Sequence, residues 1–259
     1  MPLPRVQAPI ILVHGLLGFA HLRAMGWPIA AYFNGIAEAL ENAGNQVLTP
    51  TTSPTASVAE RAGELKQFLD ANLPDGPMHI IAHSMGGLDA RYLISRLGMA
   101  GRVRSLTTLG TPHNGTAFAD WGTDNLGPAV KPFLDLFGIP TEGFFDLRRD
   151  RCAEFNDQTP DAEGVRYFSI GGVFVPDGLS SQWMLPYGII AAEEGPNDGL
   201  VSADFAHFGE DFQQWDDCNH ADLINWPDQA RQLEGRQRDR IPDCLAIVAR
   251  LAALGGTAQ

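Results

Sequence analysis

Ser84 lies in the segment 82–87 (AHSMGG), between an apolar run and a helical pattern. A serine on a tight strand-to-helix turn exposes its hydroxyl, as nucleophilic catalysis requires. Residues two before and two after it must be small, and Ala82 and Gly86 are small, although glycine is commoner at the first place. The start of the helix also directs N–H groups at a developing oxyanion. The segment therefore predicts a nucleophile at Ser84, and the alternative is an ordinary strand-to-helix junction.

A second motif, HGLLG at 14–18, follows the first apolar run. In folds with such a serine turn, one oxyanion donor comes from the residue after the nucleophile and another from a loop after an early strand. The backbone N–H groups of Leu16 and Met85 are therefore the predicted oxyanion donors. His14 precedes the turn glycine and is expected to order the loop by hydrogen bonding rather than to act as a base.

A serine nucleophile needs a general base, and the base needs an acid that orients it. The histidines after Ser84 are His113, His207 and His220. His113 lies close behind the serine turn and is expected to form a loop. His207 is flanked by phenylalanines, which favours packing. His220 comes last, in a polar segment, and is the predicted base because the order Ser, Asp or Glu, His is the one this type of site uses.

Asp198 is the predicted acid of the triad. It lies in the segment 197–202 (NDGLVS), where an Asp-Gly turn is followed by an apolar pair. Such a turn holds a carboxylate on a tight loop. Asp177 and Asp204 are the alternatives.

Apolar runs alternate with helical patterns along the first half of the chain. Strands are expected over 10–13, 46–49, 78–82, 103–109 and 164–171, and helices over 32–42, 57–72, 86–97 and 239–253. Ser57 and Glu60 fit a capping box, and Gly44 fits the end of a helix. The alternation predicts an α/β fold, with a mostly parallel sheet covered by helices on both faces. Residues 1–259 are expected to form a single domain.

The composition limits the classes of function. The chain has 259 residues and a formal charge of −13, so a groove for nucleic acid is excluded and any lipid contact is expected to be apolar. Three cysteines without CxxC spacing (Cys152, Cys218 and Cys244) are expected to be structural thiols, with a Cys218–Cys244 bridge left open. No run reaches the roughly 18 apolar residues of a membrane span. The location is expected to be cytoplasmic, or secreted without a visible signal peptide.

Residues 116–150 have weak periodicity and many Gly, Pro, Asp and Phe residues. The stretch is too long for an ordinary loop, which indicates a functional or mobile segment.

The motifs together resemble the bacterial true lipases of family I, which are triacylglycerol lipases with the α/β-hydrolase fold. The resemblance rests on HGLLG at 14–18, YFNGI at 32–36, the serine turn, GTPHNGT at 110–116, NDGLV at 197–201 and NHADLIN at 219–225. It implies the triad Ser84, Asp198 and His220, which agrees with the choice made from the residues alone. It also implies that 116–150 forms a lid, in which six apolar residues could form an amphipathic helix: Val130, Phe133, Leu134, Leu136, Phe137 and Ile139. A permanently packed cap helix is the alternative.

The family also has a calcium site, formed by two aspartates and two carbonyls. The resemblance implies Asp222, two residues after His220, and Asp177 as the aspartate ligands. Calcium would be structural there, with no part in the chemistry, and would hold the loop of His220. The disulfide of the family is not expected, because residues 202–204 contain no cysteine.

The expected function is a serine carboxylic-ester hydrolase, a triacylglycerol lipase that cleaves medium- to long-chain acyl esters through an acyl-enzyme. A carboxylesterase for short soluble esters and a phospholipase or acyltransferase are alternatives, because the same triad serves all of them. A non-catalytic binding module is disfavoured by the complete triad. The expected partner is a lipid or other acyl ester, with transient contact to a lipid interface, and the oligomeric state is not predicted.

Overall fold

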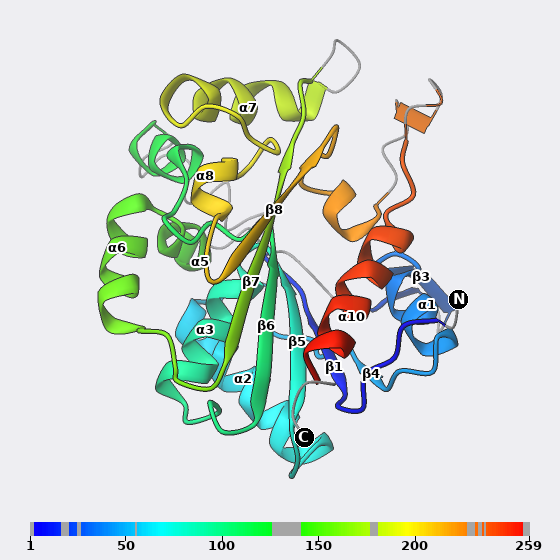
Figure 1. Cartoon of the computed structure of the whole chain (residues 1–259). Helices are drawn as coiled ribbons and strands as arrows, with labels where there is room; N and C mark the ends of the chain where they lie inside the picture. The colour runs from blue at the N-terminus through cyan, green and yellow to red at the C-terminus, as the bar shows by residue number, and fades with distance from the viewer. Residues whose placement is uncertain are drawn as a thin grey trace.

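The computed structural model describes residues 3–16, 21–24, 27–54, 56–125, 141–176, 181–226, 231–232, 235 and 237–255. A six-stranded sheet with the order β4-β1-β5-β6-β7-β8 forms its centre (Figure 1). The strands are β1 (Ile10–Val13), β4 (Val47–Leu48), β5 (Met78–His83), β6 (Val103–Leu109), β7 (Arg166–Val173) and β8 (Asp211–Asp216). Every neighbouring pair is parallel, which confirms the predicted sheet. A separate antiparallel pair is formed by β2 (His21–Ala24) and β3 (Trp27–Ala31).

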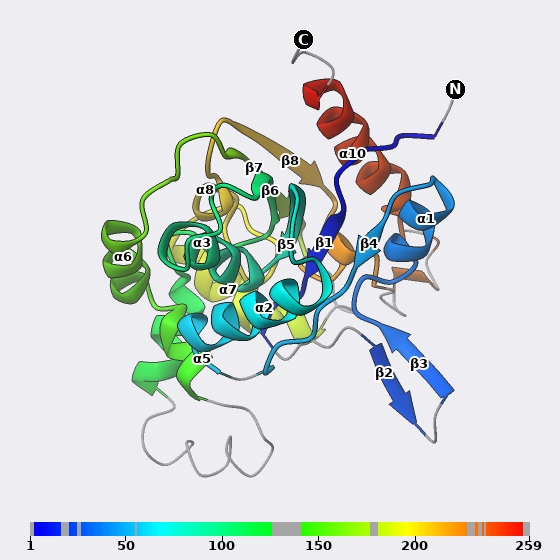
Figure 2. The ribbon, with the colours of Figure 1, turned by 90° about the horizontal axis from the view of Figure 1, so that it is seen from below.

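Helices cover both faces of the sheet (Figure 2). The long ones are α1 (Ile36–Asn42), α2 (Val58–Asn72), α3 (Gly86–Arg96), α6 (Arg149–Gln158), α7 (Ser181–Glu193) and α10 (Ile241–Gly255). Shorter ones are α5 (Thr141–Asp146), α8 (Ala203–Ala206) and the 3-10 turn η1 (Asp222–Ile224), and residues 117–125 are also helical.

Strand β1 shows why two layers of helices are needed. Its side chains alternate between the two faces, and all four are buried. Ile10 and Leu12 join the core under α1 and α10, whereas Ile11 and Val13 join the core under α2 and α3. A strand buried on both faces reads as a continuous apolar run, as the sequence predicted.

Most predicted elements agree with the structure to within a few residues. Ser57 caps α2 in a full capping box with Glu60, and Gly44 follows α1 with φ 88°. The predicted helix over 32–42 was too long at its start. It begins at Ile36 because Gly35 adopts φ 72°, which a right-handed helix does not allow.

The strands β2, β3 and β8 and the helices α5, α6, α7 and α8 were not predicted. Strand β8 has the sequence DFQQWD, its residues are all at least partly exposed, and it forms one edge of the sheet. An edge strand with so few apolar residues gives little periodic signal. It nevertheless matters for the site, because it ends four residues before His220.

Candidate active site

Ser84 occupies the turn between β5 and α3. Its φ is 55°, in the left-handed region that non-glycine residues rarely adopt. Gly86 permits this turn, because a Cβ at its position would lie 2.6 Å from the carbonyl oxygen of His14 and 2.8 Å from that of Val13. Ala82 is fully buried. The local geometry is therefore the strained, closely packed turn that the sequence predicts around Ser84.

His14 orders the loop that follows β1. Its Nδ1 lies 2.8 Å from the carbonyl oxygen of Gly15, and its Nε2 accepts the N–H of Thr52 at 3.0 Å. The imidazole is therefore neutral, with the proton on Nδ1. Burial lowers the pKa of His14 to about 4, which agrees with this state. The expectation that His14 orders the loop is thus met by its contacts.

Arg61 of α2 donates hydrogen bonds to two backbone carbonyl groups of the same loop. Its Nη2 donates to the carbonyl of His14 at 2.8 Å and to that of Gly15 at 3.3 Å. The C=O and N–H of a trans peptide point in opposite directions, so the N–H of Leu16 is turned away from Arg61. Arg61 is fully buried and is paired at 2.8 Å with Asp89 of α3, whose pKa burial raises while Arg61 opposes the rise.

The two predicted oxyanion amides come from the loop after β1 and from the serine turn itself. A Cβ on Gly15, next to Leu16, would lie 2.6 Å from Cβ of Ser84, so this loop runs directly along the nucleophile. Met85 is the N-cap of α3. Within the described part of the chain, no backbone carbonyl accepts a hydrogen bond from the N–H of Leu16 or Met85. Both amides therefore remain suited to an oxyanion.

His220 and Asp198 form a buried pair. The distance between Nδ1 of His220 and Oδ2 of Asp198 is 2.7 Å, and the backbone N–H of His220 donates to the carbonyl of Asp198 at 2.8 Å. The other carboxylate oxygen of Asp198 accepts the N–H groups of Leu200 and Val201 at 2.9 and 2.8 Å. An imidazole that donates from Nδ1 keeps its Nε2 as a proton acceptor, which is the form a general base needs.

His83 connects the serine turn with the loop of His220. Its Nε2 lies 3.0 Å from the carbonyl oxygen of His220, and the two rings are 4.5 Å apart. Its Nδ1 lies 2.7 Å from the hydroxyl of Tyr32, which in turn accepts the N–H of Gly15 at 3.0 Å. A chain of hydrogen bonds thus runs from the loop of Gly15 to the loop of His220. Burial lowers the pKa of His83 well below its usual value, which keeps the ring neutral in this chain.

The alternative histidines lie elsewhere. His113 is buried and stacks on Phe208 with the ring centres 4.3 Å apart, and its Nε2 contacts Thr108. His207 stacks on Phe212. The partners described for these two histidines do not include Ser84, which agrees with the structural roles that the sequence favours.

The alternative acids are likewise separate from His220. Asp204 is exposed in the first turn of α8, and Asp177 lies outside the described residues. Asp198 is the carboxylate that the described structure brings to His220.

The residues expected to bind calcium are only partly described. Asp222 is 2% exposed and bonds Arg231 and Gln237, while Asp177 is outside the described residues. In the described ranges, no group of three or more His, Cys, Asp or Glu side chains could hold a metal ion. The three cysteines are buried and free, so the Cys218–Cys244 bridge is not formed.

Five residues that support the site could not be identified from the sequence: Arg61, Asp89, His83, Tyr32 and Arg231. Tyr32 belongs to the YFNGI motif, but nothing in the sequence indicates that its hydroxyl would bond His83. These contacts join segments that are far apart in the chain. The only local signal was the presence of polar residues in otherwise apolar segments, such as His83 at the end of β5.

Comparisons with known proteins identify several lipases that are similar to this chain. The family model described as palmitoyl protein thioesterase matches residues 9–127. Triacylglycerol lipase 2 of Saccharomyces cerevisiae is 34% identical over 209 residues, covering 75% of this chain and 62% of the yeast protein. A triacylglycerol lipase of Vibrio cholerae is 28% identical over 258 residues, covering 85% and 80% of the two chains. The chain is thus similar in sequence to triacylglycerol lipases, and it shares the fold of lipases of known structure.

The crystal structure of Staphylococcus hyicus lipase has the same fold, with a TM-score of 0.76 at 19% identity and 98% of each chain covered. The chain spans less than two thirds of the length of the yeast relative. Across the residues that the structure describes, every helix is too short or too polar to span a bilayer.

The predicted lid falls mostly outside the description. All six apolar residues proposed for its helix lie within 126–140, which the structure does not describe. On both sides of this gap, residues 117–125 and α5 are helical. Helix α5 approaches the oxyanion loop, because a Cβ on Gly143 would lie 2.6 Å from Cδ1 of Leu16.

Proposed function

We propose that this protein is a lipase, which hydrolyses acyl esters of lipids through an acyl-enzyme on Ser84. The observation that carries the proposal is the buried pair of His220 and Asp198, joined through His83 to the strained turn of Ser84. A nucleophile, a base in the required tautomer and a buried acid in this order are the parts of a serine hydrolase.

In the first half of the reaction, Nε2 of His220 takes the hydroxyl proton of Ser84 while Oγ attacks the ester carbonyl. Asp198 keeps the imidazole in the Nδ1–H form and stabilises its positive charge. The amides of Leu16 and Met85 donate to the oxyanion. When the tetrahedral intermediate collapses, His220 gives the proton to the leaving alcohol, and the acyl group remains on Ser84.

In the second half, His220 takes a proton from water, and the hydroxide attacks the acyl-enzyme carbonyl. A second oxyanion forms at the same two amides. Its collapse breaks the ester bond to Ser84 and returns the proton to Oγ, which releases the fatty acid.

Exposed apolar side chains on two helices support a lipid-like substrate. On α5, Phe145 is 44% exposed, one residue after Phe144. On α7, Met184 and Leu185 are 51% and 57% exposed. This helix lies beyond the carboxyl end of the sheet (Figure 1), and its Trp183 packs beside the loop of Asp198, because a Cβ on Gly199 would lie 2.8 Å from the indole. Exposed apolar side chains near a site favour an apolar ligand or interface. We therefore propose medium- to long-chain acylglycerols as substrates.

The decisive experiment is hydrolysis of p-nitrophenyl esters from acetate to palmitate by the wild type and by Ser84→Ala. We expect activity that rises toward long acyl chains and a fall in kcat of about 10⁴- to 10⁶-fold in the variant. Ser57→Ala is the matched control, because it removes only the cap of α2, costs about 1 kcal/mol of stability and leaves kcat unchanged.

Activity confined to short esters would contradict the lipid substrate and support a carboxylesterase with a fixed cap. Full activity of Ser84→Ala would contradict the mechanism itself. Hydrolysis of phospholipid in place of triacylglycerol would assign the same triad to a phospholipase.

A further inference from the structure

The loop of residues 216–222, which contains His220, presents the kind of oxygen atoms that bind calcium, but two arginines bond them. Nη1 of Arg231 donates to Oδ2 of Asp222 at 2.9 Å, and Nη2 of Arg231 donates to the carbonyl of Asp217 at 2.9 Å. Arg231 also pairs with the carboxylate of Asp217 at 2.9 Å. Nη2 of Arg240 donates to the carbonyls of Asp216 and Asp217, both at 3.1 Å.

The remaining contacts of Asp222 are also to donors. Its Oδ1 accepts from Nε2 of Gln237 at 2.9 Å, and its Oδ2 accepts the backbone N–H of Asn219 at 2.9 Å. Calcium takes six to eight oxygen ligands and repels nearby cations. Arg231 and Arg240 are 2% and 1% exposed, so their charges are held next to these oxygens. The residues present therefore do not fit calcium at Asp222.

We propose that Arg231 and Arg240 do in this chain what a calcium ion would do, as positioning residues for the loop of His220. Hydrolysis is then independent of a divalent cation. The inference rests on the proposed role of His220 as the general base.

Backbone strain in the loop explains why it needs such contacts. Asp217 has φ 49°, in the left-handed region that is unfavourable for a residue other than glycine. Both arginines donate to the carbonyl of this residue, so they stabilise the turn at its strained point. The hydrogen bonds of a planar guanidinium also fix the direction of the carbonyl groups that accept them. The flexible side chain of a lysine would fix this direction less well.

The contacts of Asp222 restrain His220 through the hydrogen bonds of the neighbouring residues. Oδ1 of Asn219 accepts the N–H groups of Ala221 and Asp222, both at 2.9 Å, so residues 219–222 form one bonded turn. His220 lies within this turn and is fixed on its other sides by Asp198 and His83. Movement of Asp222 would therefore move the imidazole relative to Ser84.

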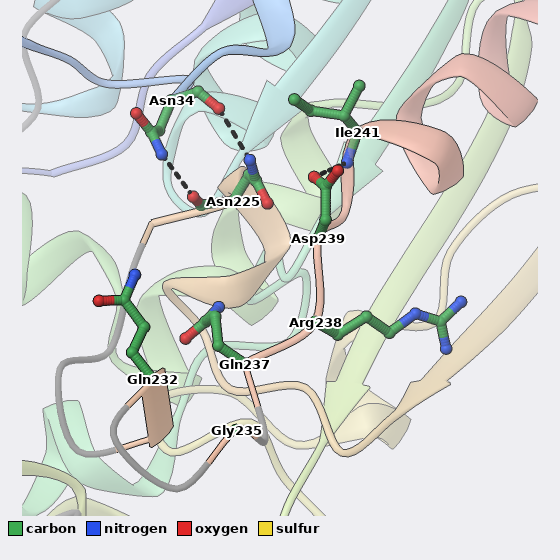
Figure 3. Close-up of a pocket in the computed structure, with 8 residues that line it drawn as sticks. All are labelled: Asn34, Asn225, Gln232, Gly235, Gln237, Arg238, Asp239 and Ile241. Atoms are coloured by element: carbon green, nitrogen blue, oxygen red, sulfur yellow. Dashed lines mark hydrogen bonds between the residues drawn. The ribbon is translucent and has the colours of Figure 1, made fainter.

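The segment that carries the arginines is anchored at several points. The N–H of Arg240 donates to Oδ1 of Asn225 at 2.9 Å, and Asn225 exchanges two hydrogen bonds with Asn34. On its other side, the segment lines a cleft of about 520 Å³, in which Gln237 and Arg238 lie beside Asp239 (Figure 3). Arg238 is exposed and pairs with Asp243 at the surface. It is therefore a matched control for Arg231.

The first test measures p-nitrophenyl ester hydrolysis and Tm of the full chain in EDTA and in calcium chloride. We expect the same kcat and the same Tm in both. Loss of activity in EDTA with recovery in calcium would overturn the inference. An inactive wild type in either solution would instead contradict the proposed function, so the two failures are distinguishable.

The second test compares Arg231→Ala, Arg231→Lys and Arg238→Ala. We expect kcat of Arg231→Ala to fall about tenfold or more with KM within about twofold, because a base displaced by a fraction of an ångström affects the transition state. Arg231→Lys should lie between Arg231→Ala and wild type, and Arg238→Ala should match the wild type.

Added guanidinium ion at low, non-denaturing concentration should restore part of the kcat of Arg231→Ala and leave Arg238→Ala unchanged. A residue that only stabilised the fold would not give this rescue. Circular dichroism identifies a variant that fails to fold, in which case Arg231→Lys carries the comparison. Wild-type kcat in Arg231→Ala, or no rescue by guanidinium, would overturn the inference.

Discussion

Two loops lie beside the segment of His83 and Ser84, and buried arginines bond the backbone of both. The oxyanion loop, residues 14–16, is bonded by Arg61, which is paired with Asp89. The histidine loop, residues 216–222, is bonded by Arg231 and Arg240, and Arg231 is paired with Asp222. Both arrangements place a guanidinium on backbone carbonyls, which fixes the direction of the peptide groups.

The surroundings of the two loops differ. Arg61 and Asp89 come from α2 and α3, which are regular helices packed on the sheet, and both side chains are fully buried. Arg231 comes from a stretch outside the central sheet and its covering helices, and the residues that follow it line an open cleft (Figure 3). The difference teaches that one half of the site is fixed by the core of the fold and the other by local polar contacts. We expect damage to the first to reduce stability, and damage to the second to reduce activity.

The largest effect is expected for the difference in unfolding free energy between Asp89→Ala and Asp222→Ala. Asp89→Ala leaves Arg61 buried without its carboxylate, which should cost about 3–5 kcal/mol of unfolding free energy. Asp222→Ala should cost less unfolding free energy. Arg231 still donates to the carbonyl of Asp217 and still pairs with its partly exposed carboxylate. Urea unfolding and kcat, measured on both variants, check the comparison. Equal stability losses with equal kcat would contradict it.

The second prediction concerns acid and the oxyanion loop. Burial lowers the pKa of His14 to about 4 from an ordinary value near 6.5, so the unfolded chain binds a proton more readily than the folded one. Arg61 adds to the lowering and Glu64 opposes it. Neutral His14 contributes about 3 kcal/mol to the unfolding free energy. This contribution is complete above the pKa of His14 in the unfolded chain and is lost as the pH falls toward 4.

Unfolding free energies at pH 7 and pH 5 measure this loss. The matched variant is His14→Asn, which keeps a donor for Gly15 but does not titrate. It should be less stable at pH 7 and should show a smaller change between the two pH values. An unchanged slope in the variant would assign the acid sensitivity to other buried histidines, such as His83.

The third prediction concerns Gly110, which lies next to the histidine loop. A Cβ at this position would lie 2.9 Å from Oδ2 of Asp198 and 3.1 Å from Nδ1 of His220, and its φ is 57°. Gly110→Ala should therefore separate the acid from the base and lower kcat about 100-fold. Gly44→Ala is the control. It also has a positive φ, but its Cβ would meet only the side chain of Arg5 at 3.5 Å. It should cost about 1 kcal/mol of stability and leave kcat unchanged.

The regular half of the molecule could be predicted from the sequence. Strand β6 was predicted over its full length, and the capping box of Ser57 marked the start of α2. Such signals are local, because periodicity and caps depend on residues a few positions apart. The serine turn was predictable for the same reason, since its strand, its helix and its small residues are adjacent in the chain.

The supporting contacts could not be predicted in this way. Arg61 lies 28 positions from Asp89, and His83 lies 137 positions from the carbonyl of His220. Such contacts depend on which elements the fold brings together. The position of His220 itself depends on β8, which the sequence did not indicate because it is an exposed edge strand. The residues of the triad remain predictions until their variants are measured.

The smallest effect is expected from Tyr32→Phe, which tests the link between the two loops. The change removes the hydroxyl that accepts from Gly15 and bonds His83, and it leaves the ring in place. A buried N–H of Gly15 without this acceptor should cost about 1–3 kcal/mol. Because the link joins the oxyanion loop to the loop of His220 without holding either alone, kcat should fall only a few-fold. Tyr92→Phe, on α3, is the control, and kcat with Tm for both variants is the measurement. If kcat of Tyr32→Phe falls as far as that of Gly110→Ala, the two loops are one coupled unit and not two independently held halves.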